Sequence, residues 1–310
     1  MHDGLTGAGV GDSLVDLAPR DATVAELERV HSAALLDGLR RLSESGGGAI
    51  DPDTTTSSGS WAAAVRAAGA GLAAAEALER GDGDAAFLAL RPPGHHATAA
   101  RAMGFCLVNH VAVTAAALVD RGERVLVVDY DAHHGNGTQD IFYAEPRVLY
   151  VSFHEWPLYP GTGRLHDTGS GAGAGTTCNF PVPAGATGDL YLRGLEEVVA
   201  PLVEGFAPTW VLVSAGFDAH RADPLTGLAL SAGDYGLLAR RVAAFAPAGR
   251  VIAFLEGGYD LEALRGSVAA TARGLLGLAA ESGEAPTSGG PGRAVVEAAA
   301  DLWRSAGAPG

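Results

Sequence analysis

Short, continuous runs of apolar residues alternate along the chain with longer stretches in which apolar residues recur at helical spacing. The continuous runs predict buried strands at 86–90, 125–128, 147–153, 210–214 and 251–255. The longer stretches predict helices from 23 to beyond 39, over 60–78, 105–118 and 189–206, from 231 onward, and over 261–278. Apolar strands that alternate with helices indicate a parallel sheet covered by helices on both faces.

Local signals mark where this pattern begins and ends. Thr23-x-x-Glu26 and Ser231-x-x-Asp234 match the capping box that starts a helix. The segment 281–292 is rich in Gly, Ser, Pro and Glu, which is typical of a linker, and a short helix is expected from 294. We therefore expect one α/β domain over residues 1–280 and a loose linker and short C-terminal helix over 281–310.

The composition excludes several classes of protein. Apolar residues make up 47% of the 310 residues and charged residues 18%, which allows a sizeable core and excludes wholesale disorder. No apolar run approaches the roughly 18 residues of a membrane-spanning helix. The net charge of −15 argues against direct binding of nucleic acid, whose phosphates need basic partners. Cys106 and Cys178 form no C-x-x-C motif, and the start of the chain has no signal-peptide pattern, so a cytoplasmic location is expected.

Polar residues gather directly after four of the predicted strands, where ligand sites form in parallel sheets. Asp131 and His133 are two apart, so on extended backbone they project the same way, and Asp218 follows another strand. Together they can hold one ion at roughly 2.0–2.2 Å and leave a position open, as catalytic zinc requires. The mixed oxygen and nitrogen set also admits iron or manganese. The alternative is that Asp131 and His133 only cap the loop.

His95 and His96 form a second candidate group, in a Pro-Gly loop after the first strand. A neutral imidazole there can accept a proton from water and return it to a leaving amine. Asp129 can hydrogen-bond one of the two rings and Asn136 the other. One catalytic and one structural histidine is the alternative. Tyr259 follows a Gly-Gly turn, from which its phenol could stabilise a developing oxyanion.

These motifs resemble the zinc-dependent histone deacetylase family, which includes acetylpolyamine amidohydrolases and acetoin-utilisation proteins. The resemblance covers about 23–275 and implies the arginase/deacetylase-like fold, a three-layer α/β/α sandwich around a mainly parallel sheet. The matching strings are Arg91-Pro-Pro-Gly-His95-His96, Gly104-Phe105-Cys106, Asp129-x-Asp131-x-His133-His134-Gly135-Asn136-Gly137, Pro160-Gly161-Thr162-Gly163, Ser214-Ala-Gly-Phe-Asp218-Ala-His220 and Gly257-Gly258-Tyr259.

The resemblance also implies roles for individual residues. One catalytic Zn²⁺ would lie on Asp131, His133 and Asp218, beside the pairs His95/Asp129 and His96/Asn136, with His96 as the proton-transferring group. Tyr259 would polarise the acyl carbonyl. Substrate contacts would come from Asp53 at the rim, from Gly104, Phe105 and Tyr159 as walls of an acyl tunnel, and from Gly257. A structural K⁺ or Na⁺ would use Asp129, Asp131, His133, Ser152 and Phe153.

The sequence departs from the family pattern at three places. Asn136 stands where many eukaryotic nuclear members have Asp, which resembles the second eukaryotic class and its bacterial relatives. Tyr159 replaces Phe and makes the tunnel more polar. The usual first strand and its His/Pro/Arg-rich loop are not found, so a truncated N-terminal edge is expected.

The predicted activity is hydrolysis of an N-acetyl amine, such as acetyl-lysine in a peptide or an acetylated polyamine, with release of acetate. A two-manganese, arginase-like ureohydrolase is the nearest alternative, but Gly135 and Gly216 stand where it needs additional carboxylates. The other alternative is an acyl-lysine-binding module without turnover. Neither the particular substrate nor the oligomeric state follows from the sequence, and a homo-oligomer stays open.

Overall fold

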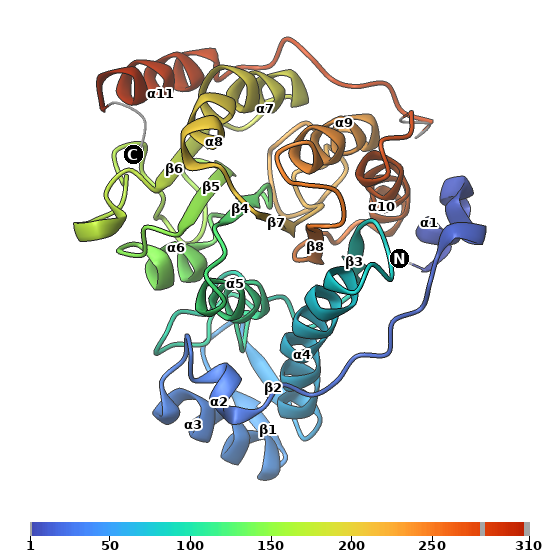
Figure 1. The fold of residues 1–310 in the computed structure, drawn as a ribbon, viewed down its shortest axis with the longest axis vertical. Coiled ribbons are helices and arrows are strands. Elements are labelled where there is room, and N and C mark those ends of the chain that lie inside the picture. The colour runs from blue at the N-terminus through green and yellow to red at the C-terminus, as the bar shows by residue number, and fades with distance from the viewer. Residues whose placement is uncertain (1, 280–282, 307–310) are drawn as a thin grey trace.

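A single sheet of parallel strands forms the centre of the protein, described here from a computed structural model over residues 2–279 and 283–306. The strand order across the sheet is β3-β8-β7-β4-β5-β6 (Figure 1). The strands are β3 (Ala86–Leu88), β4 (Val125–Asp129), β5 (Val148–Glu155), β6 (Thr177–Val182), β7 (Trp210–Ala215) and β8 (Val251–Leu255). Five of these lie where the apolar runs predict them, because both faces of a covered parallel sheet must be apolar.

Successive strand residues point to opposite faces, and each face packs on its own set of helices. Val125 and Val127 of β4 belong to the core below the sheet in Figure 1, whereas Leu126 and Val128 belong to the core above it. The lower layer contains α2 (Val24–Leu27), α3 (Ala33–Glu44), α4 (Ser60–Glu79) and α5 (His110–Asp120). The upper layer contains α7 (Gly188–Gly194), η4 (Leu195–Val199), α8 (Ala200–Phe206), α9 (Ala232–Ala243), α10 (Leu261–Leu275) and α11 (Arg293–Ala306). The predicted three-layer α/β/α sandwich is confirmed.

Two strand pairings have no counterpart in the predicted elements. β6 lies at one edge of the sheet, and its sequence contains Asn179 and Pro181, which break an apolar run. An edge strand tolerates proline because one side of its backbone needs no ladder partner. The small antiparallel hairpin of β1 (Gly47–Ala49) and β2 (Thr55–Ser57) is built from glycine, threonine and serine, which carry little hydrophobic pattern.

The helix predicted over 105–118 begins five residues later than expected. Asn109 is the N-cap of α5, and its side-chain oxygen accepts a hydrogen bond from the amide of Ala112. The apolar residues before it form a loop in which Phe105 has a positive φ of 64°. A right-handed helical backbone is excluded at Phe105, so these apolar residues belong to a loop.

The C-terminal helix is not the loose tail that its flanking composition suggests. α11 lies against β6 and buries Val296, Ala299 and Trp303 in the upper core. Residues 284–290 before it are tied to the rest of the chain, for example by the Thr287 hydroxyl, which donates to Asp234 Oδ2 at 2.7 Å. The linker prediction at 281 and 282 falls outside the described residues.

The remaining elements are short and border these layers. They are α1 (His2–Leu5), η1 (Thr6–Val10), η2 (Gly11–Ser13), α6 (Asn136–Phe142) and η3 (Gly171–Gly173). Both predicted capping boxes are present, at the starts of α2 and α9. Within 2–279 and 283–306, no helix is long and apolar enough to cross a membrane.

His31 joins the lower helices to the loop that precedes α5. Its Nε2 accepts a hydrogen bond from the amide of Asn109 at 2.9 Å, and its Nδ1 donates to the carbonyl of Thr98 at 2.9 Å. Both bonds together require the neutral ring. Burial lowers the pKa of His31 to about 4, which is below the ordinary value.

The depressed pKa of His31 predicts a loss of stability in acid. The unfolded chain takes up a proton near pH 6.5 and the folded chain only near pH 4, so stability falls as the pH falls through this window. Over the whole window the free energy of unfolding falls by on the order of 3 kcal/mol, because a pKa difference of one unit corresponds to about 1.4 kcal/mol. Urea unfolding at pH 7 and pH 5 should show a smaller pH dependence for His31→Gln than for the wild type. An unchanged pH dependence would contradict this assignment.

Candidate metal centre and active site

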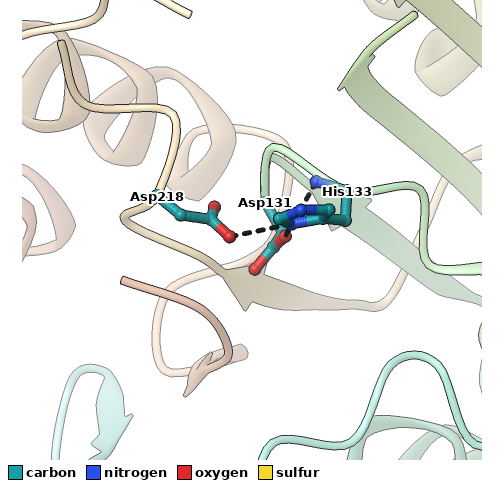
Figure 2. Close-up of side chains that lie close together, drawn as sticks. All are labelled: Asp131, His133 and Asp218. Carbon is teal, nitrogen blue, oxygen red and sulfur yellow. Dashed lines mark hydrogen bonds and ion pairs between the residues drawn. The ribbon is translucent and has the colours of Figure 1, made fainter. Parts of the chain in front are cut away.

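The three predicted metal ligands converge at the carboxyl ends of two neighbouring strands (Figure 2). Asp131 and His133 follow β4, and Asp218 follows β7, which pairs with β4. His133 Nδ1 lies 3.2 Å from Asp131 Oδ1 and 3.0 Å from Asp218 Oδ2. Tetrahedral ligands at roughly 2.0–2.2 Å from one ion are about 3.4 Å apart, so these spacings suit a single ion. The donor set therefore fits a divalent metal.

Backbone amides hold the far oxygen of each carboxylate. Gly257 donates to Asp131 Oδ2 at 2.7 Å, and Ala132 donates to Asp218 Oδ1 at 2.8 Å. The near oxygens are left facing His133. Burial lowers the pKa of His133, but the two carboxylates outweigh this effect and raise it to about 11. The cluster thus attracts positive charge strongly.

Two glycines let the chain approach these carboxylates. A Cβ atom on Gly216 would overlap Asp131 Oδ2, and one on Gly257 would overlap Asp218 Oδ2. Any side chain at either position would displace a ligand. Gly216 is one of the positions at which a two-metal centre would need a further carboxylate, and no room exists there.

The adjacent histidines have different partners. His95 Nδ1 lies 3.0 Å from Asp129 Oδ2, and His96 Nδ1 lies 2.8 Å from Asn136 Oδ1. Tyr150, which the sequence analysis does not single out, donates to Asp129 Oδ2 at 3.1 Å. The two imidazole rings are 4.1 Å apart between centroids.

These surroundings move the two histidine pKa values in opposite directions. Burial lowers the pKa of His95, but Asp129, Asp131 and Glu256 outweigh it and raise the value to about 10. Burial and the neighbouring charge of His95 lower the pKa of His96 well below its ordinary value. One ring is therefore a proton donor and the other a proton acceptor near neutral pH.

Three aromatic rings surround this pair and the metal ligands. Tyr159 presents its edge to His96 at a centroid distance of 5.2 Å, and Phe105 lies edge-to-face with Tyr259 at 6.2 Å. Gly104 has a φ of +56°, and a Cβ there would overlap the His96 ring. Phe105 is 42% exposed and Tyr159 38%, so both border solvent at the mouth of the site.

Tyr259 is oriented by residues outside the predicted set. Asp223 Oδ2 accepts a hydrogen bond from its amide at 2.7 Å, and the Arg91 guanidinium lies 5.7 Å from its ring centre. Burial and Asp131 raise the pKa of the Tyr259 phenol, so the phenol keeps its proton. Asp223 also accepts from the amide of Leu225, an exposed apolar residue that is thereby placed near Tyr259.

The predicted rim and cation residues lie near the site but differ in what they contact. Asp53 accepts a hydrogen bond from the Thr54 hydroxyl, which in turn accepts from the amide of Phe105 at 3.2 Å. Ser152 is the register partner of Asp129, and its hydroxyl lies 2.9 Å from His154 Nδ1. Phe153 is buried in the upper core. The bound K⁺ or Na⁺ stays a prediction.

Glu256 is a further residue at the site that sequence reasoning missed. It follows β8 and is fully buried, and its Oε2 accepts hydrogen bonds from the amides of Gly94 at 2.7 Å and His95 at 3.2 Å. The available signal was a glutamate placed directly after a buried strand, where an unpaired carboxylate is costly.

The sheet order, the flanking layers and the ligand cluster at the strand ends define an arginase/deacetylase-like α/β fold. A family model described as the histone deacetylase domain matches residues 1–275. The chain belongs to this family, as its motifs predict. The solved HDA15 HD domain superimposes with a TM-score of 0.89 and is 34% identical, covering 98% of this chain and 86% of that one.

Several curated proteins are similar to this chain. A probable deacetylase of Archaeoglobus fulgidus is 41% identical over 84% of this chain and 74% of its own length. A histone deacetylase-like amidohydrolase of Pseudomonas aeruginosa is 37% identical over 77% of this chain and 64% of its own. For histone deacetylase 10, chloroplastic, of Oryza sativa subsp. japonica, the identity is 48% over 62% of this chain, which corresponds to 44% of that protein.

Proposed function

We propose that this protein hydrolyses the amide bond of an N-acetylated amine, such as acetyl-lysine or an acetylated polyamine, and releases acetate. The observation that carries the proposal is the cluster of Asp131, His133 and Asp218 beside two histidines with opposed protonation. These three residues would hold one Zn²⁺, which supplies Lewis acidity to the acyl carbonyl and makes water more acidic. Family membership supports the reaction class.

The histidine pair divides the proton transfers. His96 is neutral and accepts a proton as water attacks the acyl carbon. His95 is protonated and is held through Nδ1 by Asp129, so its charge stabilises the negative charge that develops. The proton that His96 has accepted from water then passes to the departing nitrogen, and the amine and acetate leave. Asn136 keeps the His96 ring in one orientation.

Tyr259 would donate its phenolic hydrogen to the developing oxyanion. Replacing Tyr259 by phenylalanine should lower kcat by about 10²–10³ with little change in metal content, because such a donor acts in the transition state. Steady-state acetate release measures this effect. Tyr143→Phe, which removes a phenol from α6's C-terminal end, should leave the rate unchanged. An equal fall in kcat in both variants would contradict the proposed role of Tyr259.

Gly257 should be required for binding of the metal. Gly257→Ala pushes a methyl group against both ligand carboxylates, so we expect at least about a tenfold weaker affinity for Zn²⁺. Equilibrium dialysis followed by metal analysis tests this. Gly38→Ala is the matched control, because nothing lies within 4 Å of a Cβ on Gly38. Unchanged affinity in Gly257→Ala would contradict the proposed ligand set.

The substrate contacts remain proposals of the same kind. Phe105 and Tyr159 would form walls around the acyl group, with Gly104 providing space beside His96 and Asp53 at the rim near the substrate backbone. The deciding experiment incubates the Zn²⁺-loaded protein with an acetyl-lysine peptide and with an acetylated polyamine, and measures released acetate. Saturable binding without acetate would favour a non-catalytic binding module. Two tightly bound Mn²⁺ ions per chain would favour the ureohydrolase.

A further inference from the structure

Two loops bring together the groups that must act on one amide bond. The histidine loop (91–96) follows β3 and carries His95 and His96, and the tyrosine loop (256–259) follows β8 and carries Tyr259. Within the described residues, β3 is an edge strand that pairs with β8 alone, through three register positions. Because this pairing is so short, the relative placement of the two loops depends on contacts between the loops themselves.

Glu256 provides contacts from the tyrosine loop to the histidine loop. Its Oε2 accepts two backbone hydrogen bonds, from Gly94 at 2.7 Å and from His95 at 3.2 Å. Its Oε1 lies 3.3 Å from the Ser214 hydroxyl, which donates to it from the end of β7. All these atoms are buried, where a backbone amide that lost its hydrogen-bond partner would be costly.

Arg91 provides the contact in the opposite direction. Its Nη2 donates to the carbonyl of Gly258 at 3.3 Å, and its guanidinium lies over the Tyr259 ring. Gly258 has a φ of +126°, a conformation that glycine adopts freely. The tyrosine loop is thus held at its backbone and at its functional ring by a residue of the histidine loop.

We propose that Glu256 and Arg91 are positioning residues that clasp the histidine loop to the tyrosine loop, and so set His96 relative to Tyr259. This inference rests on the proposed function for its kinetic consequence, but the clasp itself is a property of the fold. Neither residue is a metal ligand, and neither needs to touch the substrate.

Hydrogen exchange tests the clasp without any reference to activity. Glu256→Leu should speed exchange of the Gly94 and His95 amides at least tenfold while the amides of β4 stay protected. Glu256→Gln retains an acceptor oxygen and should exchange at an intermediate rate. Glu262→Gln, an exposed position paired with Arg265, is the matched control. Unchanged exchange at Gly94 and His95 in Glu256→Leu would overturn the inference.

Kinetics of the Zn²⁺-loaded protein test the consequence. Glu256→Gln and Arg91→Ala should each lower kcat about 10- to 100-fold, with a smaller change in KM and unchanged zinc content. Because both residues hold the same two loops, the fall in kcat in the double variant should be much smaller than the product of the falls in the two single variants. Arg40→Ala, an exposed arginine of α3, is the control. If the fall in kcat in the double variant equals the product of the two single falls, the clasp is refuted. If the wild type releases no acetate but Glu256→Leu still speeds hydrogen exchange, only the proposed hydrolysis is refuted.

Discussion

Asp218→Ala is expected to abolish both metal binding and acetate release, the largest effect of any single substitution in this chain. In the proposed site, Asp218 offers one of three ligand atoms that lie within 4.8 Å of one another. Its loss would leave only two ligands, Asp131 and His133. Two ligands hold zinc far more weakly than three. Metal analysis after dialysis against Zn²⁺, together with the rate of acetate release, measures both losses.

Asp218→Asn separates loss of the ligand from loss of packing. The amide keeps the volume of the carboxylate, so a folded but metal-free variant is expected. Asp37→Ala on the exposed face of α3 is the control, because Asp37 forms surface ion pairs with arginines of its own helix. Full zinc content and wild-type turnover in both Asp218 variants would exclude the proposed metal site.

His96→Ala is expected to lower kcat by about 10²–10⁴ while zinc stays bound, because general base catalysis contributes this much. In the proposed mechanism His96, rather than His95, is the base. Burial and the nearby positive charge lower the pKa of His96, and Asn136 offers its ring no charge. Acetate release under saturating substrate reports kcat, and metal analysis on the same sample reports the zinc content.

Comparison with two other histidine variants sharpens this test. His95→Ala also removes a buried ring, but that ring is the protonated partner of Asp129, so its loss should leave an uncompensated carboxylate and a less stable fold. His166→Ala, at an exposed position, should behave as the wild type. A His96 variant that retains full kcat would assign the proton transfer to another group.

The fold could be predicted from the sequence where local pattern and tertiary burial agree. β4, β7 and β8 are continuous apolar runs because both faces of the sheet are covered, and the polar residues after them mark where the runs leave the core. The parallel topology then places Asp131, His133 and Asp218 at the same edge of the sheet. The spacing within one loop can be seen in the sequence, whereas the adjacency of β4 and β7 appears only in the strand order of the structure.

The features that the sequence did not reveal depend on tertiary context. Pro181 and Asn179 hide β6, which is recognisable only once an edge position is known. The turn before α5 has the composition of a helix but contains Phe105 at positive φ. Glu256 carries no spacing signal that links it to Gly94, since 162 positions separate them. Contacts of this kind arise from the packing of two strand ends and have no local pattern.

The proposed metal ligands Asp131 and Asp218 are buried, whereas Phe105, Tyr159 and Leu225 in the surrounding loops are exposed. Under the proposed function, the exposed side chains can therefore change by mutation without altering the buried ligand cluster. A library randomised at Phe105, Tyr159 and Leu225 would test whether substrate preference changes while the buried candidate ligands stay the same.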